Sequence, residues 1–280
     1  MRAMSLFRYI VIVGAVCALT ACNNTTEPAT ERQTVTLRFT RFEVQREDMS
    51  RAVKDVSEYV THLDVWIINA GDTICLHQSS TDDGFGTVSV SLDKTLTYTL
   101  YAVAHKANGP ATLKDGVISF PEDKVTHTFF VRKEFHPSET IVCPMKRIVA
   151  QLLFSTVDAI PDNVTQMRFT ISDVFNQWNV AGYGVNMLDR ISTINLSSKH
   201  DDGSATFAVY AITSDEDTPH DILVEALSSD GRVVKSHTIT GLVMRNGQRN
   251  NVSGVFFNDN IGSALRFTAD DWQDGGYYNY

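Results

Sequence analysis

Residues 96–104 read Leu-Thr-Tyr-Thr-Leu-Tyr-Ala-Val-Ala, an alternation in which every second residue is apolar and its neighbours are mainly polar. Successive side chains of a β-strand point to opposite faces of the sheet, so a period of two indicates a strand with one buried face. The same period recurs in residues 88–92, 148–154 and 207–211. These segments predict sheets that are half buried.

Six further segments are rich in β-branched and aromatic residues and lie between turn sequences: residues 63–68, 126–131, 166–171, 221–227, 232–239 and 250–257. Asn69-Ala70-Gly71-Asp72 and Asp115-Gly116 are typical of these turns. Short strands joined in this way predict an all-β fold of antiparallel sandwiches, because a parallel sheet would need repeated crossover helices. The one helical spacing of apolar residues, within 48–61, is compatible with either a short amphipathic helix or an irregular loop.

The first strand breaks the alternation. Val35, Leu37 and Phe39 share one face, but the next apolar residues are Phe42 and Val44. The pattern therefore slips by one residue near position 40. We expect a bulge or bend there that returns both sets of side chains to one core.

The N-terminus carries an export signal. Arg2 and Arg8 flank the start of an apolar stretch, residues 9–19, which is too short to span a bilayer as a permanent helix. The stretch ends in Leu19-Thr20-Ala21-Cys22, which resembles the bacterial lipobox. That resemblance implies cleavage before Cys22, acylation of its thiol and anchoring of the mature chain to a membrane by the lipid. An ordinary cleaved signal peptide is the alternative.

The mature chain is acidic. The full sequence has 24 Lys and Arg residues against 33 Asp and Glu residues, a net charge of −9, and losing Arg2 and Arg8 with the signal makes it about −11. Nucleic acid is therefore excluded as an expected partner, because phosphate backbones are bound by clusters of Lys and Arg.

The chain is long enough for two domains, and Pro144 with the basic pair at 146 and 147 separates a strand ending at Cys143 from one beginning at Ile148. The predicted organisation is a signal peptide over 1–21, a lipidated N-terminus and linker over 22–33, an N-terminal β-sandwich over 34–146 and a C-terminal β-sandwich with a short tail over 147–280.

Catalytic and metal-binding motifs are missing from the sequence. No two of the eight histidines stand three or four residues apart, which excludes a helical HExxH zinc site. The sequence also contains no Cys-x-x-Cys pair, no GxSxG motif and no phosphate-binding loop. We therefore expect no enzymatic activity, no metal site and no cofactor.

Two cysteines, Cys75 and Cys143, remain after the signal and the lipid site are set aside. An exported protein can form a disulfide between them, and two unpaired buried thiols are the alternative. Two aromatic residues are candidates for glycan contact: Trp178, which stands among Asn and Gln residues, and Tyr183. Trp66 lies within a predicted strand and is expected in the core.

The order of these elements resembles the fimbrillins of the Bacteroidales. The lipobox is followed by an early strand, by Ser50-Arg51-Ala52 and by Val60-Thr61-His62-Leu63-Asp64-Val65-Trp66-Ile67-Ile68. Pro144-Met145-Lys146-Arg147-Ile148-Val149-Ala150-Gln151-Leu152 is similar to the segment that opens their second domain. Leu242-Val243-Met244-Arg245-Asn246-Gly247 and Val252-Ser253-Gly254-Val255-Phe256-Phe257 are similar to their late hairpin. The likeness is closest to FimB-type anchoring and accessory subunits, because the chain after Phe267 is short.

This resemblance implies two transthyretin-like sandwiches, assembly with other fimbrial subunits by β-strand addition, and a place on the outer membrane with a role in adhesion to a host protein or glycan. In stalk subunits of the family, a trypsin-like protease cuts after an arginine that follows the first strand. Arg46 and Arg51 stand where such a cut would fall. The alternative is that both are loop arginines of an anchor that keeps its first strand. A function of another class is a surface glycan-binding lipoprotein with aromatic platforms.

Overall fold

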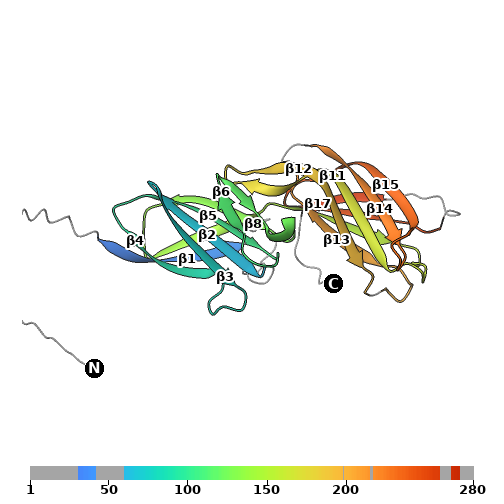
Figure 1. Ribbon diagram of the computed structural model, residues 1–280, viewed down its shortest axis with the longest axis horizontal. Helices are drawn as coiled ribbons and strands as arrows, with labels where there is room; N and C mark the ends of the chain where they lie inside the picture. The colour runs from blue at the N-terminus through green and yellow to red at the C-terminus, as the bar shows by residue number, and fades with distance from the viewer. Residues whose placement is uncertain (1–30, 42–59, 198, 215–216, 259–265, 272–280) are drawn as a thin grey trace, which may run out of the picture. The chain divides into compact units, whose positions relative to one another are not determined.

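Figure 1 shows the computed structural model, which describes residues 31–41, 60–197, 199–214, 217–258 and 266–271. Within these ranges the regular elements are β-strands, apart from one short 3-10 turn, Pro121–Asp123. The predicted all-β fold class is therefore confirmed. The described part of the chain contains no helix that is long and apolar enough to cross a membrane.

The described residues from Arg32 to Asp271 belong to one compact unit. For description we call β1–β9 the N-terminal half and β10–β17 the C-terminal half. The division into two domains at residues 146 and 147 stays a prediction.

The N-terminal half is built on one sheet with the strand order β3-β2-β5-β8-β9-β1-β4. Its strands β8 and β9 pair only through Phe129 and Phe130 with Arg147 and Lys146. The sheet therefore has two parts, β3-β2-β5-β8 and β9-β1-β4. The buried faces of β1, β2 and β5 meet in a single hydrophobic core, so these two parts enclose the core as a sandwich. The strands are β1 (Arg32–Arg41), β2 (His62–Asn69), β3 (Asp72–Ser79), β4 (Thr87–Asp93), β5 (Tyr98–His105), β8 (Phe129–Phe135) and β9 (Thr140–Arg147).

The C-terminal half contains a four-stranded sheet, β13-β10-β16-β17, and the strands β15-β14-β11, with β12 on the other side of β11. The short strands β6 (Thr112–Lys114) and β7 (Val117–Ser119) extend the second of these sheets, because β7 pairs with the end of β11. The other strands are β10 (Ala150–Thr156), β11 (Gln166–Asn179), β12 (Tyr183–Asn195), β13 (Thr206–Ala211), β14 (Pro219–Leu227), β15 (Val233–Val243), β16 (Gln248–Gly254) and β17 (Arg266–Asp271).

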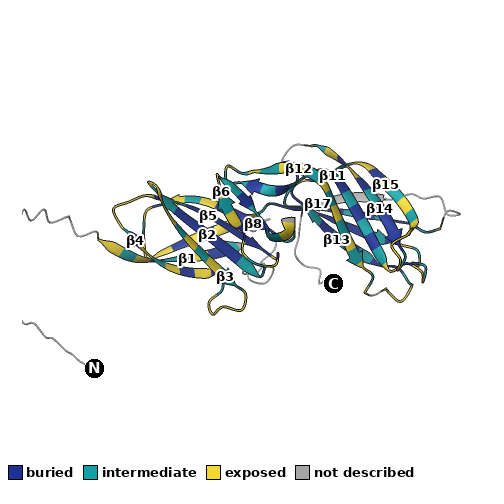
Figure 2. Ribbon diagram, in the orientation of Figure 1, coloured by how far each residue is buried: buried dark blue, intermediate teal, exposed yellow. Residues whose placement is uncertain are grey.

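Three hydrophobic clusters hold these sheets together. One lies in the N-terminal half and one in the C-terminal half, where Phe154 contacts Phe169 and Phe256 edge to face. The third cluster joins the outer face of β2 and β5 to β7 and β11, and includes Trp66 and Trp178. Figure 2 shows the buried positions alternating with exposed ones along the strands, as the period of two predicts.

Several local predictions differ from the structure or fall outside its described residues. Strand β9 does not end at Cys143 but continues through Pro144 to Arg147. Strand β12 was not among the segments expected from the sequence. The alternating face of Val35, Leu37 and Phe39 is confirmed, since all three are fully buried. The helix or loop at 48–61 and the slip toward Phe42 and Val44 lie largely or wholly outside the described residues.

Candidate functional site

The first strand lies inside a sheet, and its position is the candidate site for assembly. Strand β1 pairs antiparallel with β4, with Val35 opposite Val90. On its other side it pairs parallel with β9, where Leu37 lies opposite Ile141 and Phe39 opposite Cys143. We call this place between β4 and β9 the first-strand seat. Strands β4 and β9 are neighbours in the sheet only through β1.

The inward face of β1 packs into the core and stabilises the strand in its seat. Val35, Leu37 and Phe39 are fully buried in the N-terminal core. Burying one side chain of this size is worth about 1.5–3 kcal/mol, so the three together form a large part of the stability of a typical domain. The seat therefore matches a strand with apolar residues at alternate positions, which β1 of the same chain supplies.

Backbone contacts fix the register of β1. The Thr36 N–H donates to the Glu139 carbonyl and the Phe39 N–H to the Gly86 carbonyl, each at 2.9 Å. At the start of the strand the Arg32 guanidinium donates to the Ser91 carbonyl at 2.7 Å and to the Ser91 hydroxyl at 3.3 Å. If β1 left, β4 and β9 would each expose a row of unpaired backbone groups, which is the template for pairing with another strand.

The two cysteines do not form the candidate disulfide. Cys75 is exposed on the edge strand β3, Cys143 is buried on β9, and both are free. Cys143 lies opposite Phe39 on the neighbouring strand β9, and burial raises the pKa of its thiol to about 11.

The two glycan-contact candidates differ in exposure. Trp178 is only 4% exposed and packs in the third hydrophobic cluster, where its ring meets Phe130 edge to face. The expectation that Trp178 offers an exposed stacking surface is therefore wrong. Tyr183, at the start of β12, is 55% exposed, and its glycan contact stays a prediction. Trp66 is buried, as expected.

The remaining predicted site residues lie outside the described residues: the lipidation site Cys22 and the candidate cleavage sites Arg46 and Arg51. Their chemistry stays a prediction from the sequence. The seat itself was only partly foreseen, because the alternation marks β1 as a strand but does not show that β4 and β9 enclose it.

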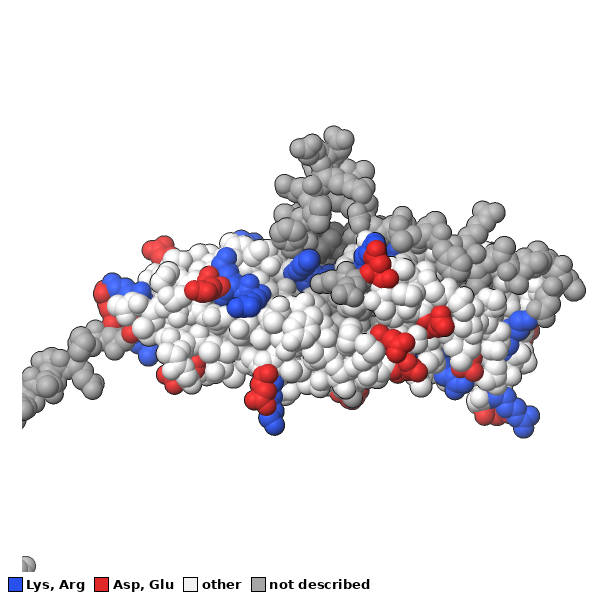
Figure 3. All heavy atoms as spheres, turned by 90° about the horizontal axis from the view of Figure 1, so that it is seen from above, with Lys and Arg blue, Asp and Glu red and all other residues white. Residues whose placement is uncertain are grey.

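Charged side chains do not gather into one field on the face shown in Figure 3. There the Lys and Arg side chains lie interspersed with Asp and Glu, with wide uncharged areas between them. A contact on this face would rest on uncharged polar and apolar groups rather than on long-range attraction.

Solved structures share this architecture. A candidate cell adhesion protein from Bacteroides ovatus superposes with a TM-score of 0.54 at 13% identity, covering 88% of this chain and 100% of that chain. The fimbrial anchor protein Mfa2 from Porphyromonas gingivalis superposes with a TM-score of 0.50 at 11% identity, covering 88% and 100%. This chain has the fold of Bacteroidales fimbrial and adhesion proteins. The fimbrillin-like fold implied by the sequence resemblance is thus confirmed.

A candidate polysaccharide-binding protein from Bacteroides thetaiotaomicron has the same fimbrillin-like fold, with a TM-score of 0.53 at 10% identity over 86% of this chain and 98% of that chain. No protein-family model and no curated protein sequence matches the chain. At these identities the likeness shows the fold, and the fold alone does not decide among anchoring, adhesion and glycan binding.

Proposed function

We propose that this chain is a lipid-anchored structural subunit of a fimbria on the outer membrane, of the anchoring type, and that it supports cell adhesion without catalysing a reaction. In this role it keeps β1 in its own first-strand seat and binds a neighbouring subunit by β-strand addition at a sheet edge. The observation that carries the proposal is the seat itself, in which the strand nearest the lipobox is fully buried on its inward face.

The distance along the chain from lipid to sheet supports this role. Cys22 precedes the start of β1 at Arg32 by ten residues, a length that spans at most about 35 Å when extended. A pull transmitted through a growing fimbria would reach the lipid through β1. Because β1 pairs on both sides, such a load is shared by two rows of backbone hydrogen bonds.

Edge strands offer places for the neighbouring subunit. Strand β4 ends the N-terminal sheet, and β17 ends the four-stranded sheet, pairing only with β16 among the described strands. An unpaired edge supplies backbone donors and acceptors, and the pockets for alternate side chains supply specificity. The partners of this proposal are therefore other fimbrial subunits.

Labelling with a clickable fatty acid tests the anchor. Cells expressing the wild-type chain should incorporate the label into this protein, and the Cys22→Ser variant should not. Cys75→Ser is the matched control, because it also removes a thiol but leaves the lipobox intact. Equal labelling of wild type and Cys22→Ser would contradict lipid anchoring.

Glycan binding is the second candidate function, favoured by the exposure of Tyr183 alone now that Trp178 is known to be buried. A glycan array probed with residues 33–280 tests it. Specific binding that is lost in Tyr183→Ala would favour this function over anchoring. Capture of a polymerising fimbrial partner with no glycan signal would favour the anchor.

A further inference from the structure

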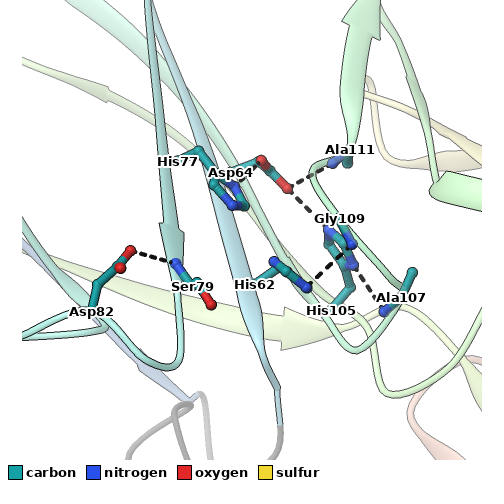
Figure 4. Close-up of polar contacts among 9 residues, drawn as sticks. All are labelled: His62, Asp64, His77, Ser79, Asp82, His105, Ala107, Gly109 and Ala111. Atoms are coloured by element: carbon teal, nitrogen blue, oxygen red, sulfur yellow. Dashed lines mark hydrogen bonds and ion pairs between the residues drawn. The ribbon is translucent and has the colours of Figure 1, made fainter.

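Residues 107–111, which connect β5 to β6, are held by side chains of the neighbouring strands. Three backbone N–H groups of this segment donate to them: Ala107 to His105 Nδ1 at 3.2 Å, Gly109 to His62 Nε2 at 3.3 Å, and Ala111 to Asp64 Oδ2 at 2.9 Å. Figure 4 shows these three contacts side by side. We call His62, Asp64 and His105 the histidine clamp.

The hydrogen bonds fix the protonation state of both clamp histidines. His105 Nδ1 accepts a hydrogen bond from the Ala107 N–H, so the ring carries its own hydrogen on Nε2, which donates to Asp64 Oδ2 at 2.9 Å. His62 Nε2 accepts from Gly109, so its hydrogen lies on Nδ1, which is buried and has no hydrogen-bond partner among the described residues. Both rings hold the segment in their neutral forms.

His62 is placed where a positive charge is unfavourable. Its ring stacks on His77 with 5.4 Å between centroids and on His105 with 5.5 Å. Burial lowers the pKa of His62, and His105 and His77 lower it further through the positive charge that each carries when protonated, whereas Asp64 opposes this only in part. The titratable groups that face His62 are therefore Asp64 on its own strand, His77 on β3 and His105 on β5.

We propose that the histidine clamp is a pH-sensitive fastening, in which protonation of His62 releases residues 107–111. A protonated His62 would present an N–H on Nε2 to the Gly109 N–H, so an accepting contact would become a repulsion between two donors. No group of three or more His, Cys, Asp or Glu side chains that could hold a metal ion occurs in the described parts of the chain.

The direction of the pH effect follows from the lowered pKa. When the clamp is closed, His62 binds a proton less readily than after residues 107–111 are released, because release removes the Gly109 N–H from Nε2 and lessens the burial that lowers the pKa of His62. The clamp is therefore fully closed above pH 6.5 and loosens as the pH falls through the lowered value. Mild acid opens it, and neutral pH closes it.

Release of the segment would reach the C-terminal half. Residues 107–111 lead directly into β6 and β7, and β7 pairs with β11 through Val117, Ile118 and Ser119. The Gln177 side chain also donates to the Ser119 hydroxyl at 2.9 Å. The clamp therefore controls how firmly the β6–β7 hairpin is held where it joins β11, and an acidic medium would weaken this junction.

Amide hydrogen exchange of the full-length chain in detergent, followed by mass spectrometry at pH 7.5 and pH 5.0 and corrected for intrinsic rates, tests the proposal. Protection of residues 107–111 should fall as the pH drops from about 6.5 toward the lowered pKa of His62, by at most about tenfold per pH unit, and should then level off, while peptides from β14 keep theirs. His62→Phe cannot be protonated and lacks the acceptor, so the segment should exchange quickly at both pH values.

A second variant and a control separate the clamp from general instability. His62→Gln supplies an acceptor that does not titrate, so its protection should be independent of pH, and this variant carries the test if His62→Phe does not fold. His136→Gln changes an exposed histidine outside the clamp and should keep the wild-type pH dependence. Protection of residues 107–111 that is unchanged between the two pH values, or a pH dependence that survives in His62→Gln, would overturn the proposal.

Discussion

The first strand of the N-terminal half and the first strand of the C-terminal half occupy the same topological position. Strand β1 pairs antiparallel with β4 and parallel with β9, and strand β10 pairs antiparallel with β13 and parallel with β16. The inward face of β1 holds Val35, Leu37 and Phe39, and that of β10 holds Ala150, Leu152 and Phe154, all fully buried. By packing alone the two strands are equivalent.

They differ in how they are attached. Only Ile148 and Val149, both buried, separate β9 from β10, and beyond the far end of β10 the Asp158 carboxylate accepts the N–H groups of Phe256, Phe257 and Asn258 at 2.7–2.9 Å. In contrast, eighteen residues, 42–59, stand between β1 and the next described residue, Val60. Burial of the inward face stabilises both strands. A short connection to a neighbouring strand also prevents a strand from leaving the sheet and being replaced by a strand of another subunit. Of the two strands, β10 is joined to its preceding strand by two buried residues, whereas the connection that follows β1 lies outside the described residues.

Truncating the largest inward side chain of each strand is the strongest test of their equivalence. Phe39→Ala and Phe154→Ala should each lower the free energy of unfolding by about 3–5 kcal/mol, because each removes a fully buried ring and leaves a cavity. Chemical denaturation followed by circular dichroism measures both. A loss below about 1 kcal/mol for Phe39→Ala alone would show that β1 contributes little to the intact chain.

Thiol labelling sharpens the comparison on the N-terminal side. Cys143 lies beside β1 on β9, and its raised pKa of about 11, against a usual 9.0, leaves about 100-fold less thiolate at pH 8. Iodoacetamide should therefore modify the exposed Cys75 at least about 100-fold faster than Cys143 in the native chain, as measured by peptide mass spectrometry. Comparable rates at the two cysteines would mean that β1 leaves its seat readily.

The Asp158 contact tests the attachment of β10. Asp158→Ala removes the acceptor of three N–H groups and should cost about 1–3 kcal/mol in the free energy of unfolding. Asp162→Ala, an exposed carboxylate on the following loop, is the matched control and should change the stability by less than about 0.5 kcal/mol. Equal effects of the two substitutions would remove the reason for treating β10 as fixed.

Alternation in the sequence predicted most strands because a half-buried sheet requires it, but it could not predict their partners. Strand β1 lies against β9, about a hundred residues later in the chain, and no local pattern specifies that pairing. Trp178 shows a second limit. A register shift between Ile171 and Val174 moves the buried positions of β11 from odd to even residue numbers, so Trp178 turns inward despite its polar neighbours.

The histidine clamp shows the same limit for a site. His62, Asp64 and His105 have no recognisable spacing in the sequence, and they meet because His62 pairs with His105 across adjacent strands while Asp64 stands two residues after His62 on β2. A correct register for β2, β3 and β5 would have revealed the cluster, and that register depends on contacts between distant segments. The resemblance to a lipobox, in contrast, rests on a local stretch of sequence, and lipidation of Cys22 stays a prediction.

Limited digestion with trypsin tests most directly the central claim that this chain keeps its own first strand. The purified chain is cut after Arg46 or Arg51, then analysed by size-exclusion chromatography and mass spectrometry, with Cys143 labelling as a second readout. We predict a monomer in which the cut piece carrying β1 stays bound and Cys143 stays protected, because β1 remains paired with β4 and β9. Loss of that piece, formation of oligomers and rapid labelling of Cys143 would contradict the anchor and identify a polymerising subunit instead.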